Sequence, residues 1–132
     1  MPLANPYQRY QSTSVQTADP AQLLLLTYEA IVRWLNRAET AVMDGNLARA
    51  HEGLLSAQAL LRDLSTSLDF EQGDVAWNLA RLYDYMIERL VAANVAKDKA
   101  IVAEVRALVV PLLEAWRVAV VQARRQGLVQ AS

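Results

Sequence analysis

The chain has 132 residues and a nearly balanced charge, with 13 Lys and Arg against 14 Asp and Glu, for a formal net charge of −1. Both signs are scattered along the sequence, which argues against binding to nucleic acid or anionic lipid, since both require clustered positive charge. The absence of cysteine excludes disulfides, thiolate metal sites and thiol catalysis.

Residues 1–18 form a polar arm ahead of the first strong helix signal. The stretch from Met1 to Gln16 lacks the apolar segment of a secretory signal, and no apolar run in the chain approaches the roughly 20 residues that span a bilayer. We therefore expect a cytoplasmic protein without membrane insertion. The spacing of Tyr7 and Tyr10 places both on one side of a helical turn. The arm, extended or short-helical, is expected to be either a frayed tail or a docking segment that pins these tyrosines on the folded domain.

The first helix is predicted to run from the capping residue Asp19 to about residue 43. Pro20 suits the first turn of a helix, and Gln22 stands three residues after the cap, as in a capping box. The turn signal Asp44-Gly45-Asn46 ends this helix.

Two further helices are predicted over about residues 47–68 and 75–95, separated by a break that contains Gly73. The first of them has a clean three-and-four alternation of apolar residues, which is typical of helices in left-handed bundles. Gly53 weakens this helix by about 1 kcal/mol relative to Ala, a cost that tertiary packing can offset.

The last helix is predicted over about residues 100–126, with Gly127 as its stop. Pro111 lies inside it and cannot donate a hydrogen bond to the carbonyl of Ala107, so either a bend or a division into two helices is expected. The apolar rows continue in phase on both sides of Pro111, which favours one bent helix.

The predicted fold is all-α: an antiparallel up-down four-helix bundle over residues 19–127, preceded by the arm over residues 1–18 and followed by a tail over residues 128–132. Short links between successive helices favour antiparallel neighbours, and no segment alternates with the period of two residues that indicates a strand.

The residue inventory predicts neither enzyme nor metal or cofactor site. A di-metal site in a bundle needs Glu-x-x-His on two helices, whereas this chain has only His51, preceded at that spacing by Ala48. We expect His51 to be an ordinary surface residue. The hydroxyls of residues 65–67 have no histidine base near them in the sequence, and the four glycines stand singly rather than in a phosphate loop.

Excess apolar surface is the feature with most bearing on function. The third helix carries one apolar row from Val75 to Ala93 and a second row that contains Tyr83, Ile87 and Val91; the first and last helices also carry second rows. The second rows indicate either a thick core or a groove that receives an apolar partner helix. For the groove and the arm together, the predicted partner-binding residues are Tyr7, Tyr10, Trp34, Tyr83, Ile87, Val91, Leu113 and Trp116.

Several motifs, in order and spacing, resemble those of the flagellar secretion chaperone FliS family over roughly residues 5–116. They are Asn5-Pro6-Tyr7 with Tyr10, Thr17-Ala18-Asp19-Pro20, Ser67-Leu68-Asp69, Leu82-Tyr83-Asp84-Tyr85-Met86, Ala93-Asn94 and Trp116. The resemblance implies a cytoplasmic chaperone that binds the carboxy-terminal segment of flagellin, prevents premature polymerisation and hands it to the type III export apparatus.

The resemblance also implies that the arm rearranges when flagellin binds, which makes Tyr7 and Tyr10 a displaceable plug of the groove. Contacts with the export gate and with regulatory proteins are expected as well. As a chaperone, the protein is expected to be a monomer or a weak homodimer. The alternative is a self-associating helical protein without a flagellin client, whose second rows bury a dimer interface.

Overall fold

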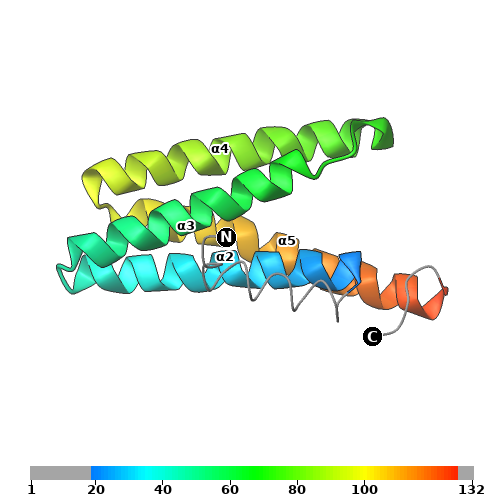
Figure 1. Cartoon of the computed structure of the whole chain (residues 1–132), viewed down its shortest axis with the longest axis horizontal. Coiled ribbons are helices and arrows are strands. Elements are labelled where there is room, and N and C mark those ends of the chain that lie inside the picture. Colours follow the sequence, from blue (N-terminus) through cyan, green and yellow to red (C-terminus); the bar gives the residue numbers. More distant parts are fainter. Residues whose placement is uncertain (1–18, 128–132) are drawn as a thin grey trace, which may run out of the picture.

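The computed structural model describes residues 19–127, which form four long helices and one short 3-10 helix (Figure 1). The elements are α2 (Pro20–Met43), α3 (Leu47–Thr66), η1 (Phe70–Gln72), α4 (Asp74–Ala96) and α5 (Lys99–Arg125). The predicted all-α four-helix bundle is confirmed, and no strand occurs between residues 19 and 127. The predictions for the arm, including Tyr7 and Tyr10, and for the tail lie outside the described residues.

The start of α2 follows from its capping residue. The side chain of Asp19 accepts a hydrogen bond from the Gln22 backbone N–H at 2.7 Å, as the sequence predicted. The Gln22 side chain, however, accepts a hydrogen bond from Arg124 Nη2 at 3.1 Å, at the far end of α5. The cap therefore also ties the two ends of the helical domain together.

Each helix packs against two neighbours, in the cyclic order α2, α3, α4 and α5, and α2 lies beside α5 (Figure 1). Three arginines of α5 pair with carboxylates of α2 or its cap, in opposite chain order, so these helices are antiparallel. The pairs are Arg106 with Glu39 at 2.7 Å, Arg117 with Glu29 at 3.0 Å and Arg124 with Asp19 at 3.6 Å. These pairs lie along most of the α2–α5 interface and fix the register of the two helices.

Helix α5 continues through Pro111 without interruption, so the division into two helices does not occur. Both Pro111 and Ala107 are exposed, and water can therefore reach the carbonyl that Pro111 leaves without a backbone donor. The bend at Pro111 stays a prediction.

Helices α2 and α3 approach each other closely at Gly53. A Cβ atom added there would lie 3.1 Å from the Ala38 Cβ and 3.1 Å from the Trp34 carbonyl oxygen. Since this glycine is buried, its missing side chain allows the two backbones to pack at this distance.

The centre of the core contains a hydrogen bond between two tyrosines. The hydroxyls of Tyr28 on α2 and Tyr83 on α4 are 2.5 Å apart, and the two residues are 0% and 2% exposed. The Trp116 ring packs near Tyr28, with ring centroids 6.5 Å apart. Burial raises the pKa of both tyrosines above its usual value, and for Tyr83 the hydrogen bond to Tyr28 raises the pKa further. Both side chains therefore stay neutral in the folded protein.

Replacing Gly53 by leucine is expected to lower the free energy of unfolding by about 1–3 kcal/mol, because the added side chain meets the α2 backbone. Urea denaturation measures the effect. The matched control is Ala59→Leu, at an exposed position of the same helix, which should change the free energy by less than about 0.5 kcal/mol. Equal stability of the two variants would contradict the close approach.

The tyrosine pair is expected to show strong coupling in a double-mutant cycle. Tyr83→Phe leaves the Tyr28 hydroxyl buried without this partner and should cost about 1–3 kcal/mol, as should Tyr28→Phe. The double variant should recover part of this loss, because neither hydroxyl is then left unpaired. Additive losses in urea denaturation would rule out the coupling.

The raised pKa values of the two tyrosines predict that the free energy of unfolding depends on pH. The stability that the tyrosines contribute is fully present below the unfolded pKa of about 10 and falls as the pH rises further, because only the unfolded chain then releases these protons. The double phenylalanine variant should lose stability less steeply above pH 10 than the wild type.

Candidate functional site

The structure separates the six predicted partner-binding residues of the described range into three places. They are Trp34 between α2 and α3, the row Tyr83, Ile87 and Val91 on α4, and the pair Leu113 and Trp116 on α5. Each of the two hollows described below is lined by one of the six residues, Trp34 in one and Ile87 in the other. The six residues thus come from three different helices, and their assignment to one partner-binding surface stays a prediction.

The α4 row changes from buried to exposed along its length. Tyr83, Ile87 and Val91 follow one another at four-residue spacing and share one side of the helix. Tyr83 is in the core, Ile87 is partly buried against it, and Val91 is 45% exposed. Ile87 and Val91 are therefore accessible to a partner, whereas Tyr83 supports them from beneath.

A hydrogen bond between α3 and α4 sets the register of this side of the bundle. His51 Nδ1 lies 2.8 Å from Asn94 Nδ2, and both groups are at the surface, as expected for His51. One turn after His51 comes Leu55, and one turn before Asn94 comes Val91. The antiparallel register thus places Leu55 and Val91 at the same level, and each is 45% exposed. From this register we infer that the two side chains form an apolar strip across the two helices.

A hollow of about 380 Å³ adjoins this strip. It is lined by Arg62, Ser65 and Thr66 of α3 and by Asp84, Ile87 and Glu88 of α4. Ile87 is the large apolar residue of this lining, and the other lining residues include charges of both signs. We call the surface formed by Leu55, Ile87 and Val91 with this hollow the α3–α4 face.

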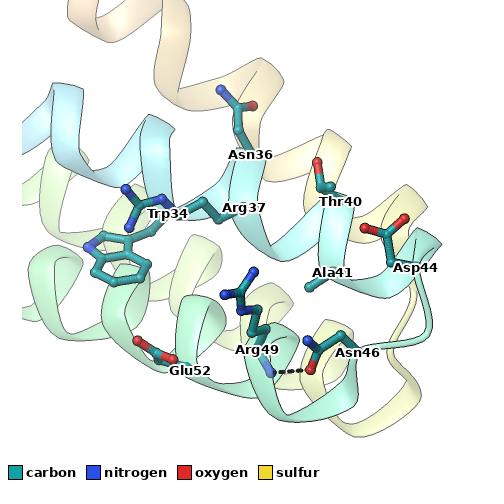
Figure 2. A pocket seen from close by; sticks show the side chains of 9 residues that line it. All are labelled: Trp34, Asn36, Arg37, Thr40, Ala41, Asp44, Asn46, Arg49 and Glu52. Atoms are coloured by element: carbon teal, nitrogen blue, oxygen red, sulfur yellow. Dashed lines mark hydrogen bonds between the residues drawn. The ribbon is translucent and has the colours of Figure 1, made fainter.

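Trp34 lies in a separate hollow of about 650 Å³ between α2 and α3, near the turn that joins them (Figure 2). The guanidinium of Arg37 stands 5.0 Å from the centre of the Trp34 ring, and the Arg49 side chain reaches into the space between the helices (Figure 2). Asp44 and Glu52 also line this hollow. Its surroundings are charged with both signs, so it differs from the apolar groove that the sequence predicted around Trp34.

On α5, the apolar row that contains Leu113 and Trp116, which the sequence analysis assigned to a groove, faces the core. Val102, Val109, Leu113 and Val120 are buried, and Trp116 is partly buried against the core. Leu113 and Trp116 therefore stabilise the bundle in this structure. Two adjacent apolar rows of one helix look alike in sequence, and only the packing of the other three helices decides which row turns inward.

Sequence reasoning missed two exposed features. Leu55 lies next to the predicted apolar row of α3. Its only signal in the sequence was its place one helical turn after His51, on the same side of the helix. The second feature is the pair Phe70 and Trp77, which lie in the predicted break and near the start of the predicted third helix and are 42% and 53% exposed. Two aromatic residues flanking Gly73 in a stretch without basic residues were the signal available.

The described residues offer little to other classes of site. Between residues 19 and 127 no three His, Asp or Glu side chains come together in a way that could hold a metal ion. In the same part of the chain, no helix is both long and apolar enough to cross a membrane.

Comparisons with known proteins agree with the resemblance in the motifs. The family model of the flagellar protein FliS matches residues 3–123. The flagellar secretion chaperone FliS of Bacillus subtilis is 33% identical over 125 residues, which cover 95% of this chain and 93% of the relative. The FliS of Salmonella typhimurium is 35% identical over 80% of this chain and 79% of its own length, and FliSB of Pseudomonas aeruginosa is 33% identical over 83% and 90%. Because these matches span most of both sequences, the chain belongs to the FliS family of flagellar secretion chaperones.

Proposed function

We propose that this chain is a cytoplasmic export chaperone that binds the carboxy-terminal region of flagellin, prevents its premature polymerisation and hands it to the flagellar type III export apparatus. Membership of the FliS family supports the role of an export chaperone. The observation that carries the binding step is the α3–α4 face, where the exposed Leu55 and Val91 accompany a hollow that combines Ile87 with charged side chains.

The chemistry of the α3–α4 face suits a helix that forms on binding. A client helix with apolar residues at three-and-four spacing can place them on Leu55, Ile87 and Val91. The charges of Arg62 and Glu88, which line the hollow, can pair with client charges and select one register. Ordering a disordered client costs several kcal/mol of the interaction energy, which keeps the complex reversible.

The remaining predicted residues have supporting roles in this proposal. Tyr83 and Leu113 hold the core beneath the contact surface, and Trp116 packs against that core. Trp34 offers a second contact on the other side of α3. Tyr7 and Tyr10 form the displaceable plug that covers the binding surface before the client arrives. Contacts with the export gate and with regulatory proteins belong to the same proposal.

Isothermal titration calorimetry with the carboxy-terminal segment of flagellin from the same genome tests the proposal. We expect saturable one-to-one binding with a negative heat-capacity change, because apolar surface is buried. Ile87→Asp and Val91→Asp should each weaken binding at least about tenfold, since a charge replaces an apolar contact. The control is Val118→Asp at a 57% exposed position of α5, outside the α3–α4 face, which should bind like the wild type.

Val91→Asp is the decisive variant, because a charge at the exposed Val91 disturbs the fold less than one at the partly buried Ile87. Far-UV circular dichroism and urea denaturation monitor folding of all three variants. Wild-type affinity of a folded Val91→Asp protein would place the client elsewhere, and the absence of binding heat at several temperatures would reject this client.

Self-association is the second candidate function, because the exposed Leu55 and Val91 also suit contact between two copies. Analytical ultracentrifugation separates the two functions. A chaperone stays a monomer or a weak homodimer over the concentration range, whereas a mass that doubles at micromolar concentration and returns to the monomer in Val91→Asp would support self-association.

A further inference from the structure

An exposed aromatic pair lies at the beginning of α4, away from the α3–α4 face. The rings of Phe70 and Trp77 are in contact, with centroids 4.3 Å apart and planes inclined by 41°. Trp77 is 53% exposed and Phe70 42%, and Val75 beside them is 63% exposed. None of the three belongs to the hydrophobic core. Large apolar side chains that touch one another and remain exposed are typical of contact sites.

The local backbone holds this pair in place. The Asp69 carboxylate accepts a hydrogen bond from the Glu71 backbone N–H at 3.0 Å and caps η1. Gly73 then adopts φ of 80°, a left-handed conformation that favours glycine, and the chain turns directly into α4. This turn brings Phe70 back against Trp77. The two rings are thus positioned before any partner binds, which lowers the entropy cost of binding.

The surroundings of the pair are acidic. Between Arg62 and Arg81 the chain carries four acidic residues, Asp63, Asp69, Glu71 and Asp74, and no Lys, Arg or His. Within the described range, Glu71 and Asp74 take part in none of the ion pairs. The two carboxylates lie between the two rings in the sequence and are both exposed. The site therefore combines apolar rings with unpaired negative charge.

We propose that Phe70 and Trp77, with Glu71 and Asp74, form a docking site for a cationic amphipathic segment of a protein partner. An apolar side chain of the partner packs on the rings, and a Lys or Arg beside it lies over a ring face and against the carboxylates. Tryptophan is enriched among the residues that dominate binding energy at such contacts. We call these four residues the aromatic–acidic patch.

The charge of the aromatic–acidic patch selects this class of partner. Nucleic acid and anionic membrane surfaces are repelled by the carboxylates. The same patch of a second copy is repelled as well, since like charges would face each other. The site goes beyond flagellin binding, because Ile87 and Val91 of the α3–α4 face lie in the second half of α4.

Titration with a synthetic peptide tests the proposal. The probe is acetyl-Leu-Lys-Lys-Leu-Leu-Lys-Lys-Leu-amide, which lacks tryptophan, and its counterpart carries Glu in place of every Lys. The full-length protein is labelled with ¹⁵N, and the indole N–H of Trp77 reports on binding. We expect the lysine peptide to shift this signal until it saturates, with an affinity that falls as the salt concentration rises. The glutamate peptide should leave the signal unchanged.

Matched variants locate the binding. Two variants should each lower the affinity for the lysine peptide at least about tenfold, as measured by calorimetry. They are Trp77→Ala and the double variant Glu71→Lys/Asp74→Lys. Glu52 is another exposed carboxylate that takes part in no ion pair among residues 19–127, and the control Glu52→Lys should change the affinity by less than about twofold. Unchanged affinity of Trp77→Ala, or equal binding of the glutamate peptide, would overturn the proposal.

Sedimentation velocity distinguishes a partner protein from a second copy of this chain. Without peptide, the wild type and Trp77→Ala should have the same sedimentation coefficient at every protein concentration. Self-association of the wild type that Trp77→Ala abolishes would overturn the proposal in favour of a second copy as the occupant.

Discussion

The hydrogen bond between the hydroxyls of Tyr28 and Tyr83 is the constraint on which the rest of the structure depends. It joins α2 and α4, which are diagonally opposite in the bundle and do not pack directly against each other. A buried hydroxyl without a partner is costly, so each tyrosine holds the other inside the core. Once Tyr83 points inward, the helical spacing leaves Ile87 at the edge of the core and Val91 at the surface. The accessible part of the α3–α4 face is therefore a consequence of this internal bond.

The two sides of the bundle are held in different ways. Three ion pairs and the close approach at Gly53 fix α2 against α5 and α3. On α4, Arg89 pairs with Glu104 of α5, and this pairing keeps the pKa of Glu104 below its usual value. Between α3 and α4, by contrast, the described residues form no ion pair. The hydrogen bond of His51 to Asn94 closes one end of that interface, and the apolar strip continues from it. A partner that binds at the α3–α4 face therefore has no ion pair between these helices to displace.

Much of the fold was predictable, because it depends on local signals. Asp19 and Asn46 cap their helices, and the predicted helix ends agree with the observed ones to within two residues. The site was less predictable, because it depends on which of two adjacent apolar rows turns inward. Leu113 and Trp116 belong to the core row of α5, and Trp34 lies among charged residues, although all three share the sequence pattern of Ile87. The aromatic–acidic patch was also missed, since contact between Phe70 and Trp77 arises from the left-handed backbone at Gly73.

The measurement that tests the central claim most directly is methyl NMR of the full-length protein titrated with the carboxy-terminal segment of flagellin. Methyl groups of Leu55, Ile87 and Val91 report on the α3–α4 face, and the exposed Val118 of α5 serves as an internal control outside it. If the client binds at this face, the signals of Leu55, Ile87 and Val91 should shift and saturate together, while that of Val118 stays in place. Saturable shifts elsewhere with these three signals unchanged would contradict the assignment of the binding surface.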